Sequence, residues 1–187
     1  MRILILYEER STEQGIQIRQ TVKQLLENKG FDVDTLLLRR EQLKPCVGCV
    51  SCWLKTPGSC IITDDDANKI ASLKMQADAV VLVSEIVYGG FSADIKAYLD
   101  RSIQNIMPYF KNYRGEMHHP KRYKRFPIWL AIGYGAKSEG EKVTFIKLTE
   151  RNALNMHPDR YLGLAIDNEE ELMQKVDNIL DILEVRA

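Results

Sequence analysis

The sequence has no excess of charge of either sign. It contains 26 lysine and arginine residues and 26 aspartate and glutamate residues, so its formal net charge is zero. Proteins that bind nucleic acids or anionic membranes through bulk electrostatics carry a surplus of basic side chains. We therefore expect no nucleic-acid partner, and a specific site must select whatever this protein binds.

The sequence also has no long hydrophobic run. No segment approaches the roughly 20 apolar residues that a membrane helix needs, and the apolar run at 3–7 is too short for a signal peptide. There is no internal repeat, low-complexity tract or Gly/Ser linker that would divide the chain. These absences predict a cytoplasmic protein without membrane association, folded as a single domain over residues 1–187.

Cysteine is scarce but clustered. All four cysteines lie in one segment with the spacing Cys46-x2-Cys49-x2-Cys52-x7-Cys60. Cytosolic thiols stay reduced, so such a cluster indicates metal or redox chemistry rather than disulfides. Thiolates are the preferred ligands of iron-sulfur clusters and zinc, and the short spacings let a tight turn aim the sulfurs inward. We predict one metal centre, with [4Fe-4S] ahead of zinc; the alternative is a reduced loop without metal.

Hydrophobic periodicity predicts an alternating α/β fold. Short apolar segments typical of buried strands occupy 3–7, 33–38, 79–83, 128–132 and 162–166. Helical spacing of apolar residues occurs in 18–26, 95–106, 139–156 and 172–183. Thr63, followed by three aspartates, predicts the start of one more helix with its hydroxyl as the cap. Parallel strands need crossover connections, so we expect a five-stranded parallel sheet with helices on both faces.

Two predicted connections are long. The loop at 39–63 carries the cysteines, and an insertion at 108–125 carries aromatic and basic residues with His118 and His119. Long loops in a compact domain are commonly functional or disordered. We expect the two histidines in a solvated or subunit-contacting loop rather than in catalysis, and Trp53 packed against the sheet edge or a neighbouring subunit.

The ends of three predicted strands carry residues suited to a phosphorylated planar ligand. After the first strand, Arg10, Ser11 and Thr12 precede a helix, whose amino end binds phosphate through free N–H groups. After the third strand, the segment 87–90 has paired glycines that let backbone approach a flat ring. The segment 133–135 follows the fourth strand. The alternative for the paired glycines is a tight turn without a ligand.

Several segments resemble known flavoproteins. The segment 92–101, with 87–90 before it, resembles the flavin-ring loop and following helix of the flavodoxin-like NADPH-dependent FMN reductases. The cysteine spacing resembles that of the related iron-sulfur flavoproteins, and 109–123 resembles an insertion in some flavodoxin-family proteins. This resemblance implies a flavodoxin-like three-layer sandwich with strand order 2-1-3-4-5. It also implies FMN bound by Arg10, Ser11, Thr12, Gln14, Val87, Tyr88, Gly89, Gly90, Gly133, Tyr134 and Gly135.

Two positions depart from the family pattern. The family's phosphate loop usually opens with Gly-Ser-Pro-Arg or a similar sequence, whereas Glu8 and Glu9 stand before the matching Arg10 here. Glu85 stands where a proline is usual before the ring loop. A carboxylate directed at a phosphate would weaken binding, so we expect Glu8 and Glu9 to point into water or to pair with Arg10.

The expected function is an FMN-dependent oxidoreductase or electron-transfer flavoprotein. Electrons would pass from NAD(P)H through FMN, with a [4Fe-4S] cluster, to a small-molecule or protein acceptor, and no side chain need act as acid or base. The two long loops predict a homo-oligomer, a dimer or tetramer. The alternatives are a non-enzymatic electron carrier and a cofactor-free scaffold with a cysteine-bound zinc. A signalling receiver domain does not fit, because Glu85 and Asp167 stand near the places of its aspartate and lysine.

Overall fold

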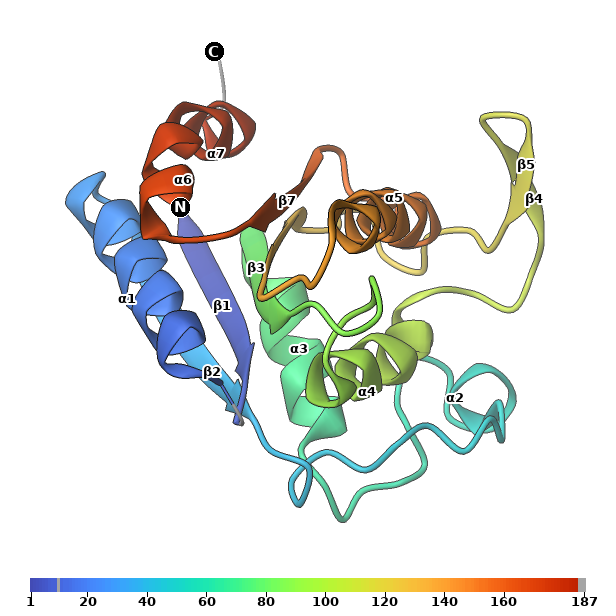
Figure 1. Cartoon of the computed structure of the whole chain (residues 1–187). Coiled ribbons are helices and arrows are strands. Elements are labelled where there is room, and N and C mark those ends of the chain that lie inside the picture. The colour runs from blue at the N-terminus through green and yellow to red at the C-terminus, as the bar shows by residue number, and fades with distance from the viewer. Residues whose placement is uncertain (10, 185–187) are drawn as a thin grey trace.

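The computed structural model describes residues 1–9 and 11–184 and contains a central parallel sheet (Figure 1). Five strands form the sheet in the described part of the chain: β1 Arg2–Glu8, β2 Asp32–Leu38, β3 Ala79–Glu85, β6 Ile128–Tyr134 and β7 Tyr161–Ile166. Their order across the sheet is β2-β1-β3-β6-β7. Counted along the chain, this is the predicted order 2-1-3-4-5, which is confirmed.

Helices cover both faces of the sheet. One face carries α1 Glu13–Asn28, α6 Glu169–Gln174 and α7 Val176–Leu183. The other carries α3 Ala67–Gln76, α4 Ala93–Arg101 and α5 Glu139–Met156. The predicted three-layer sandwich is therefore confirmed. Within the described ranges, no helix combines the length and the apolar character needed to cross a bilayer.

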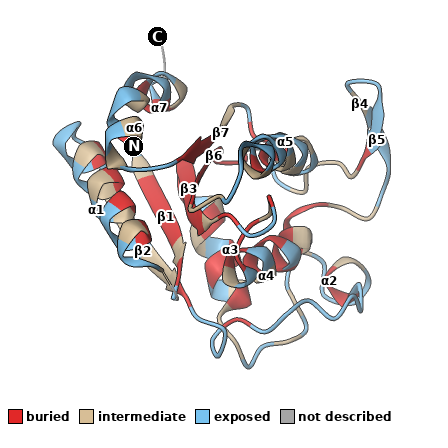
Figure 2. Ribbon diagram, viewed as in Figure 1, coloured by how far each residue is buried: buried red, intermediate tan, exposed pale blue. Residues whose placement is uncertain are grey.

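The core forms two layers because strand side chains alternate between the faces. In β1, Ile3 and Ile5 pack with α1, whereas Leu4 and Leu6 pack under α4. Figure 2 shows the strands in the middle of the sheet as buried and the long loops as mostly exposed. β3 and β6 are buried along nearly their whole length and read as continuous apolar runs, whereas the edge strand β2 is only partly buried and carries Asp32 and Asp34.

The helix after the cysteine loop begins later than expected. α3 starts at Ala67, with Asp66 rather than Thr63 at its amino end, so the predicted Thr63 cap is wrong. The physical reason is Asp65, whose side chain is 0% exposed and pairs with Arg101 at 2.8 Å. This pairing takes the aspartate run out of the helix and into a turn.

The 108–125 insertion contains a small hairpin, β4 Lys111–Tyr113 and β5 Glu116–His118, which stands away from the sheet beyond α5 (Figure 1). Of the two settings predicted for His118, the solvated one is wrong, because its ring is buried between Asn155 and Glu116, with both contacts at 3.0 Å; the subunit-contacting one stays a prediction. His119 stacks against Trp53 with the ring centres 4.7 Å apart. Trp53 therefore packs on the insertion rather than on the sheet edge.

Trp53 belongs to a short helix, α2 Ser51–Leu54, inside the cysteine loop. Its indole N–H donates to the carbonyl of Ile103 at 3.0 Å, in the 3₁₀ helix η1 Ser102–Asn105 that continues α4. The cysteine loop is thus fastened to the end of α4 and to the insertion. Two long loops that are separate in the sequence form one structural unit.

Gly133 tests how tightly the sheet and its helices pack. A Cβ at Gly133 would lie 2.7 Å from both Ile86 and Phe145, so Gly133→Ala should lower the free energy of unfolding by about 1–3 kcal/mol through overpacking. Gly140→Ala is the control, because Gly140 has only Ser138 Oγ nearby, at 3.7 Å, and lies in α5. It should be neutral or stabilising by up to about 1 kcal/mol. Urea unfolding measures both, and equal stabilities would contradict the packing argument.

Candidate functional site

The predicted ligand loops meet at the carboxyl ends of the strands. A Cβ at Gly135, after β6, would lie 3.6 Å from Glu85 at the end of β3 and 4.0 Å from Gln14 in α1. The Gln14 amide donates in turn to the carbonyl of Asp167 after β7, at 2.5 Å. Ligands of open α/β sheets bind at this edge, where the strand order reverses. Residues that lie far apart in the sequence thus border one site.

The segment 87–90 is a tight turn that presents an aromatic ring. Val87 and Gly90 exchange backbone hydrogen bonds at 3.0 and 2.9 Å. Tyr88 and Gly89 between them have φ angles of 51° and 76°, the geometry of a type I′ turn. Gly89 is required here, because a Cβ would also lie 2.7 Å from Thr144. The side chain of Tyr88 is left 92% exposed beside the site and can stack on a planar ligand.

Gly133 and Tyr134 lie beneath this edge rather than on its surface. Both are buried, and the Tyr134 hydroxyl donates to Glu8 Oε1 at 2.6 Å. Burial raises the pKa of Tyr134, and the nearby Glu8 carboxylate raises it further, so the phenol stays protonated as a donor. A side chain at Gly133 would meet Ile86 and Phe145, and that of Tyr134 points to Glu8. Only Gly135 of this segment is therefore open toward the site.

Glu8 is the centre of a buried hydrogen-bond network, so the prediction that it points into water is wrong. Glu8 is only 2% exposed. Its carboxyl group accepts hydrogen bonds from the Tyr134 hydroxyl, from Ser92 Oγ at 2.7 Å and from the Glu85 N–H at 2.8 Å. Burial raises the pKa of Glu8, although the three donors oppose that rise. Glu9 behaves as predicted, half-exposed and paired with Arg39 at 3.3 Å.

Strand alternation could have revealed the burial of Glu8. Leu4 and Leu6 face the α4 side of the sheet, and Glu8 continues the same register. Its carboxylate is therefore held on the α4 side and ties the ends of β1, β3 and β6 together. The sequence gives the register but not the partners, since Ser92 and Tyr134 come from distant segments.

The predicted phosphate loop is largely engaged within the protein. Ser11 Oγ donates to the carbonyl of Glu8 at 2.8 Å, and Thr12 caps α1 by accepting from the Gly15 N–H at 3.2 Å. Arg10 lies outside the described residues. The Thr12 hydroxyl proton and the N–H groups of the first turn are the donors that a helix amino end offers to a phosphate. The amino end of α1 therefore fits a phosphate through Thr12 and the backbone.

An acidic cavity lies at the same edge. It measures about 670 Å³ including its open mouth, and its charged lining residues are Glu8, Glu9, Arg40, Glu41, Glu85 and Asp94. Carboxylates repel a phosphate dianion at short range. The amino end of α1 is therefore a better place for an anionic group than this cavity.

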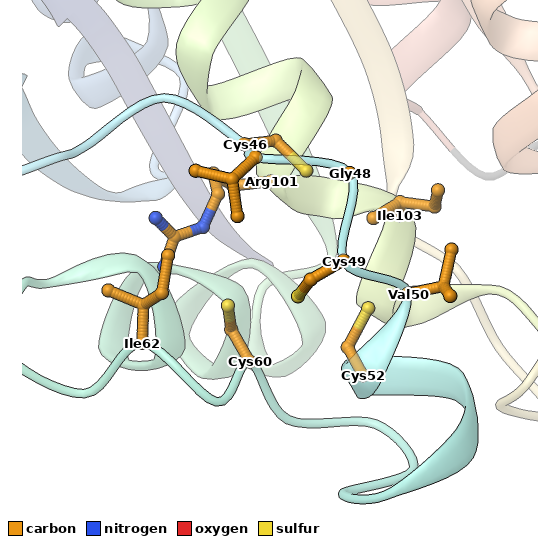
Figure 3. A pocket seen from close by; sticks show the side chains of 10 residues that line it. Cys46, Gly48, Cys49, Val50, Cys52, Cys60, Ile62, Arg101 and Ile103 are labelled. Atoms are coloured by element: carbon orange, nitrogen blue, oxygen red, sulfur yellow. The ribbon is translucent and has the colours of Figure 1, made fainter.

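The four cysteines line one cavity, which we call the cysteine cavity (Figure 3). It measures about 400 Å³ including its mouth, and its other side chains are Val47, Val50, Ile62, Arg101 and Ile103. Gly48 and Val50 have φ angles of 67° and 49°, so left-handed backbone bends the chain between the cysteines as the short spacings predicted. Burial raises the pKa of the Cys52 thiol, and negative charge on the other three cysteines raises it further.

The fourth cysteine is held by residues that the sequence did not reveal. The Cys60 N–H donates to Asn68 Oδ1 at 2.7 Å and to Gln104 Oε1 at 3.1 Å, and Asn68 donates back to the Cys60 carbonyl at 2.9 Å. Gln104 is 1% exposed. α3 and η1 thus fix the backbone of Cys60 opposite the other three cysteines. No local motif marks Asn68 or Gln104, because each acts across the fold.

The cysteine cavity has the number and type of donors that either predicted centre needs. All four thiols are free, and within residues 1–9 and 11–184 no three histidine, cysteine or carboxylate side chains are arranged to hold one metal ion. Zinc draws its sulfurs to about 2.3 Å from one point. A [4Fe-4S] cluster instead spaces its four thiolates around a larger body. The choice between the two centres stays a prediction.

Comparison with known families agrees with these features. The family model of NADPH-dependent FMN reductase matches residues 1–140. The chain belongs to this family. Membership supports the coarse assignment of an FMN-linked oxidoreductase, and it accords with a candidate flavin edge built from the loops after β1, β3 and β6.

Sequence relatives add a link to iron-sulfur flavoproteins. An iron-sulfur flavoprotein of Methanocaldococcus jannaschii is 34% identical over 85 residues, which are 46% of this chain and 42% of that protein. One from Methanosarcina thermophila is 30% identical over 80 residues, 43% of this chain and 40% of that protein. The matched part thus spans less than half the length of these curated relatives.

Solved structures share the fold. An NAD(P)H:quinone oxidoreductase from Methanothermobacter marburgensis superposes with a TM-score of 0.73 at 10% identity, covering 100% of this chain and 99% of that one. An azoreductase from Bacillus anthracis gives 0.65 at 13% identity, covering 98% and 94%. At such low identity these similarities establish the flavodoxin-like fold alone.

The buried carboxyl of Glu8 should make stability depend on pH. Because its pKa in the folded protein is raised above 4.5, the folded state keeps this proton to higher pH than the unfolded state does. The corresponding stability is present below 4.5 and is lost as pH rises through the folded pKa. Gln cannot lose a proton, so the unfolding free energy of wild type minus that of Glu8→Gln should fall from about pH 4 to about pH 8.

Urea unfolding across this pH range measures the difference. Glu9→Gln is the matched control, because its carboxylate is exposed next to Arg39, and its difference from wild type should stay level. A level difference for Glu8→Gln as well would show that burial does not hold the proton on Glu8.

Proposed function

We propose that the chain is an FMN-dependent oxidoreductase that passes electrons from NAD(P)H through FMN and a [4Fe-4S] cluster to a small-molecule or protein acceptor. The observation that carries the proposal is the cavity lined by four free thiols in a chain of the NADPH-dependent FMN reductase family. The iron-sulfur flavoproteins among its relatives support the same combination of cofactors.

The residues at the strand ends would hold FMN at two points. Thr12 and the first turn of α1 would bind the phosphate, with Ser11 and Gln14 beside them. The turn at 87–90 and Gly135 would border the ring, where the exposed Tyr88 can stack. Gly133 and Tyr134 would support this edge from beneath rather than touch the ligand with side chains.

The protein's own contribution is to position and to insulate. When bound, FMN would take a hydride from NAD(P)H and release its electrons singly or as a pair. The Glu8 network locks the ends of β1, β3 and β6, so the loops that border the ring stay in register. No described side chain needs to act as acid or base, and we assign none as catalytic.

The cysteine cavity supports the second cofactor. The ligands would be Cys46, Cys49, Cys52 and Cys60. The first three come from the tight turn, and the backbone of the fourth is held by α3 and η1. Reduced thiols of this kind persist in the cytoplasm, which is the location we propose. Apolar side chains of the cavity would keep solvent from a bound cluster.

We also propose a homo-oligomer formed through the two long loops. Both loops expose large apolar side chains with 66–71% of their surface accessible: Val47, Leu54, Tyr109, Phe110 and Met117. Exposed apolar surface on projecting segments is typical of subunit contacts. A neighbouring subunit that covers these residues would also shield the cysteine cavity.

The visible spectrum and the turnover of anaerobically purified protein test the proposal. We expect two flavin bands, broad brown absorption that dithionite bleaches, and steady-state oxidation of NAD(P)H. Both chromophores without turnover would indicate the non-enzymatic electron carrier instead. A colourless protein with bound zinc would indicate the cofactor-free scaffold, and either result would contradict the proposed enzyme.

Gly90 allows a clean test of the ring site. A Cβ at Gly90 meets only the Val87 carbonyl, at 3.4 Å, so the fold accepts a side chain there. Gly90→Val should nevertheless weaken FMN binding by on the order of tenfold or more, because it fills the space that the ring approaches. Gly140→Ala should leave binding unchanged. Fluorescence titration measures affinity and thermal unfolding checks the fold; unchanged FMN affinity in folded Gly90→Val would place the ring elsewhere.

A further inference from the structure

Arg101 has one nitrogen that nothing in the described protein satisfies. The residue is 3% exposed, at the carboxyl end of α4. Its Nη1 donates to Asp65 Oδ2 at 2.8 Å and to the Lys44 carbonyl at 2.9 Å, and its Nη2 donates to Asp65 Oδ1 at 3.1 Å. Its Nε is buried and has no hydrogen-bond partner. A buried N–H without an acceptor costs free energy, so its presence calls for a partner.

The side chain that carries the unsatisfied nitrogen lines the cysteine cavity. Figure 3 shows the Arg101 side chain at one side of the cavity, next to the space that the four cysteines surround. The other side chains of the wall are aliphatic or carry sulfur. An occupant of the cavity can supply the acceptor that Nε lacks, and the sulfurs of a cluster are such acceptors.

Five buried side-chain atoms lack a hydrogen-bond partner among the described residues, and Arg101 Nε is one of two that belong to arginines. The other is Nε of the half-buried Arg19, whose guanidinium lies 4.1 Å from the centre of the Tyr7 ring, where a cation is stabilised. No such aromatic contact is recorded for Arg101 among the described residues. Its spare donor is thus unexplained by the protein alone.

We propose that Arg101 binds the cluster directly: its Nε–H donates to a sulfur of the [4Fe-4S] cluster and raises the cluster's reduction potential. This inference rests on the proposed function, which places the cluster in the cysteine cavity. Reduction adds one electron and so one negative charge to the cluster. A hydrogen bond and a positive charge beside the sulfurs stabilise that reduced form more than the oxidised one.

Asp65 sets how strongly Arg101 acts. Its carboxylate is 0% exposed and also accepts from the Lys44 and Ala67 N–H groups, each at 3.1 Å, so it holds the guanidinium in one orientation. It also offsets the positive charge that faces the cavity. Removing the charge of Asp65 should therefore raise the cluster's reduction potential, whereas removing the charge of Arg101 should lower it.

The test measures the cluster's reduction potential by an EPR-monitored redox titration after anaerobic reconstitution. Asp65→Asn should shift the potential upward relative to wild type. The reduction potential should be lower in Arg101→Gln and in the charge-balanced Arg101→Gln/Asp65→Asn than in Asp65→Asn. In Arg101→Gln it should also be lower than in wild type. Arg125→Lys is the control. Arg125 pairs with Asp78 and does not line the cysteine cavity, so the cluster's potential in this variant should equal that of wild type.

The outcomes separate this inference from the cluster itself. A wild-type protein that takes up no iron and sulfide overturns the cluster assignment and the role of Arg101 together. If the wild-type protein binds a cluster but Asp65→Asn and the double variant have the same reduction potential, the role of Arg101 alone is overturned. Circular dichroism identifies a variant that has lost its fold, and the double variant avoids the unpaired buried carboxylate that Arg101→Gln leaves.

Discussion

The buried ion pair between Asp65 and Arg101 is the constraint on which both candidate sites depend. It fastens the end of the cysteine loop to the carboxyl end of α4, with both side chains almost fully buried. At the other end of the same helix, Ser92 contacts the buried Glu8 beneath the candidate flavin edge. One helix therefore sets the position of the cysteine cavity relative to the strand ends. Its nine residues span about 13 Å.

The two sites differ in how they are stabilised. At the strand ends, polar groups from β1, β3 and β6 converge on one carboxylate, and the exposed parts are a turn and a helix end. In the cysteine loop, the backbone is fixed from outside by Asn68, Gln104 and Asp65, while the thiols themselves are free. The protein's own contacts therefore hold the backbone of the loop on which the four thiols stand.

The sequence was informative wherever the structure depends on local pattern. The five strands and the helix at 139–156 follow from apolar runs and periodicity, the strand order follows from the family resemblance, and the structure confirms them. The tight cysteine turn likewise follows from its spacing. These features need no knowledge of distant partners.

The errors share the opposite cause. Glu8 was expected in water or paired with Arg10, Thr63 as a cap, and His118 in a solvated or subunit-contacting loop. What each residue does in the structure is decided by a residue far along the chain. Glu8 is buried because Tyr134 and Ser92 reach it, and α3 starts late because Arg101 captures Asp65. A polar residue looks solvated until its buried partner is known, and pairing of this kind leaves no trace in a single sequence.

The number of electrons that one chain accepts tests the central claim most directly. Anaerobic titration of the reconstituted protein with dithionite, followed by absorption and EPR, counts them. FMN takes two electrons and a [4Fe-4S] cluster takes one, so the account predicts about three per chain. About two electrons with no cluster signal would leave a simple flavoprotein, about one would leave a cluster without flavin, and none would contradict the assignment of a redox function.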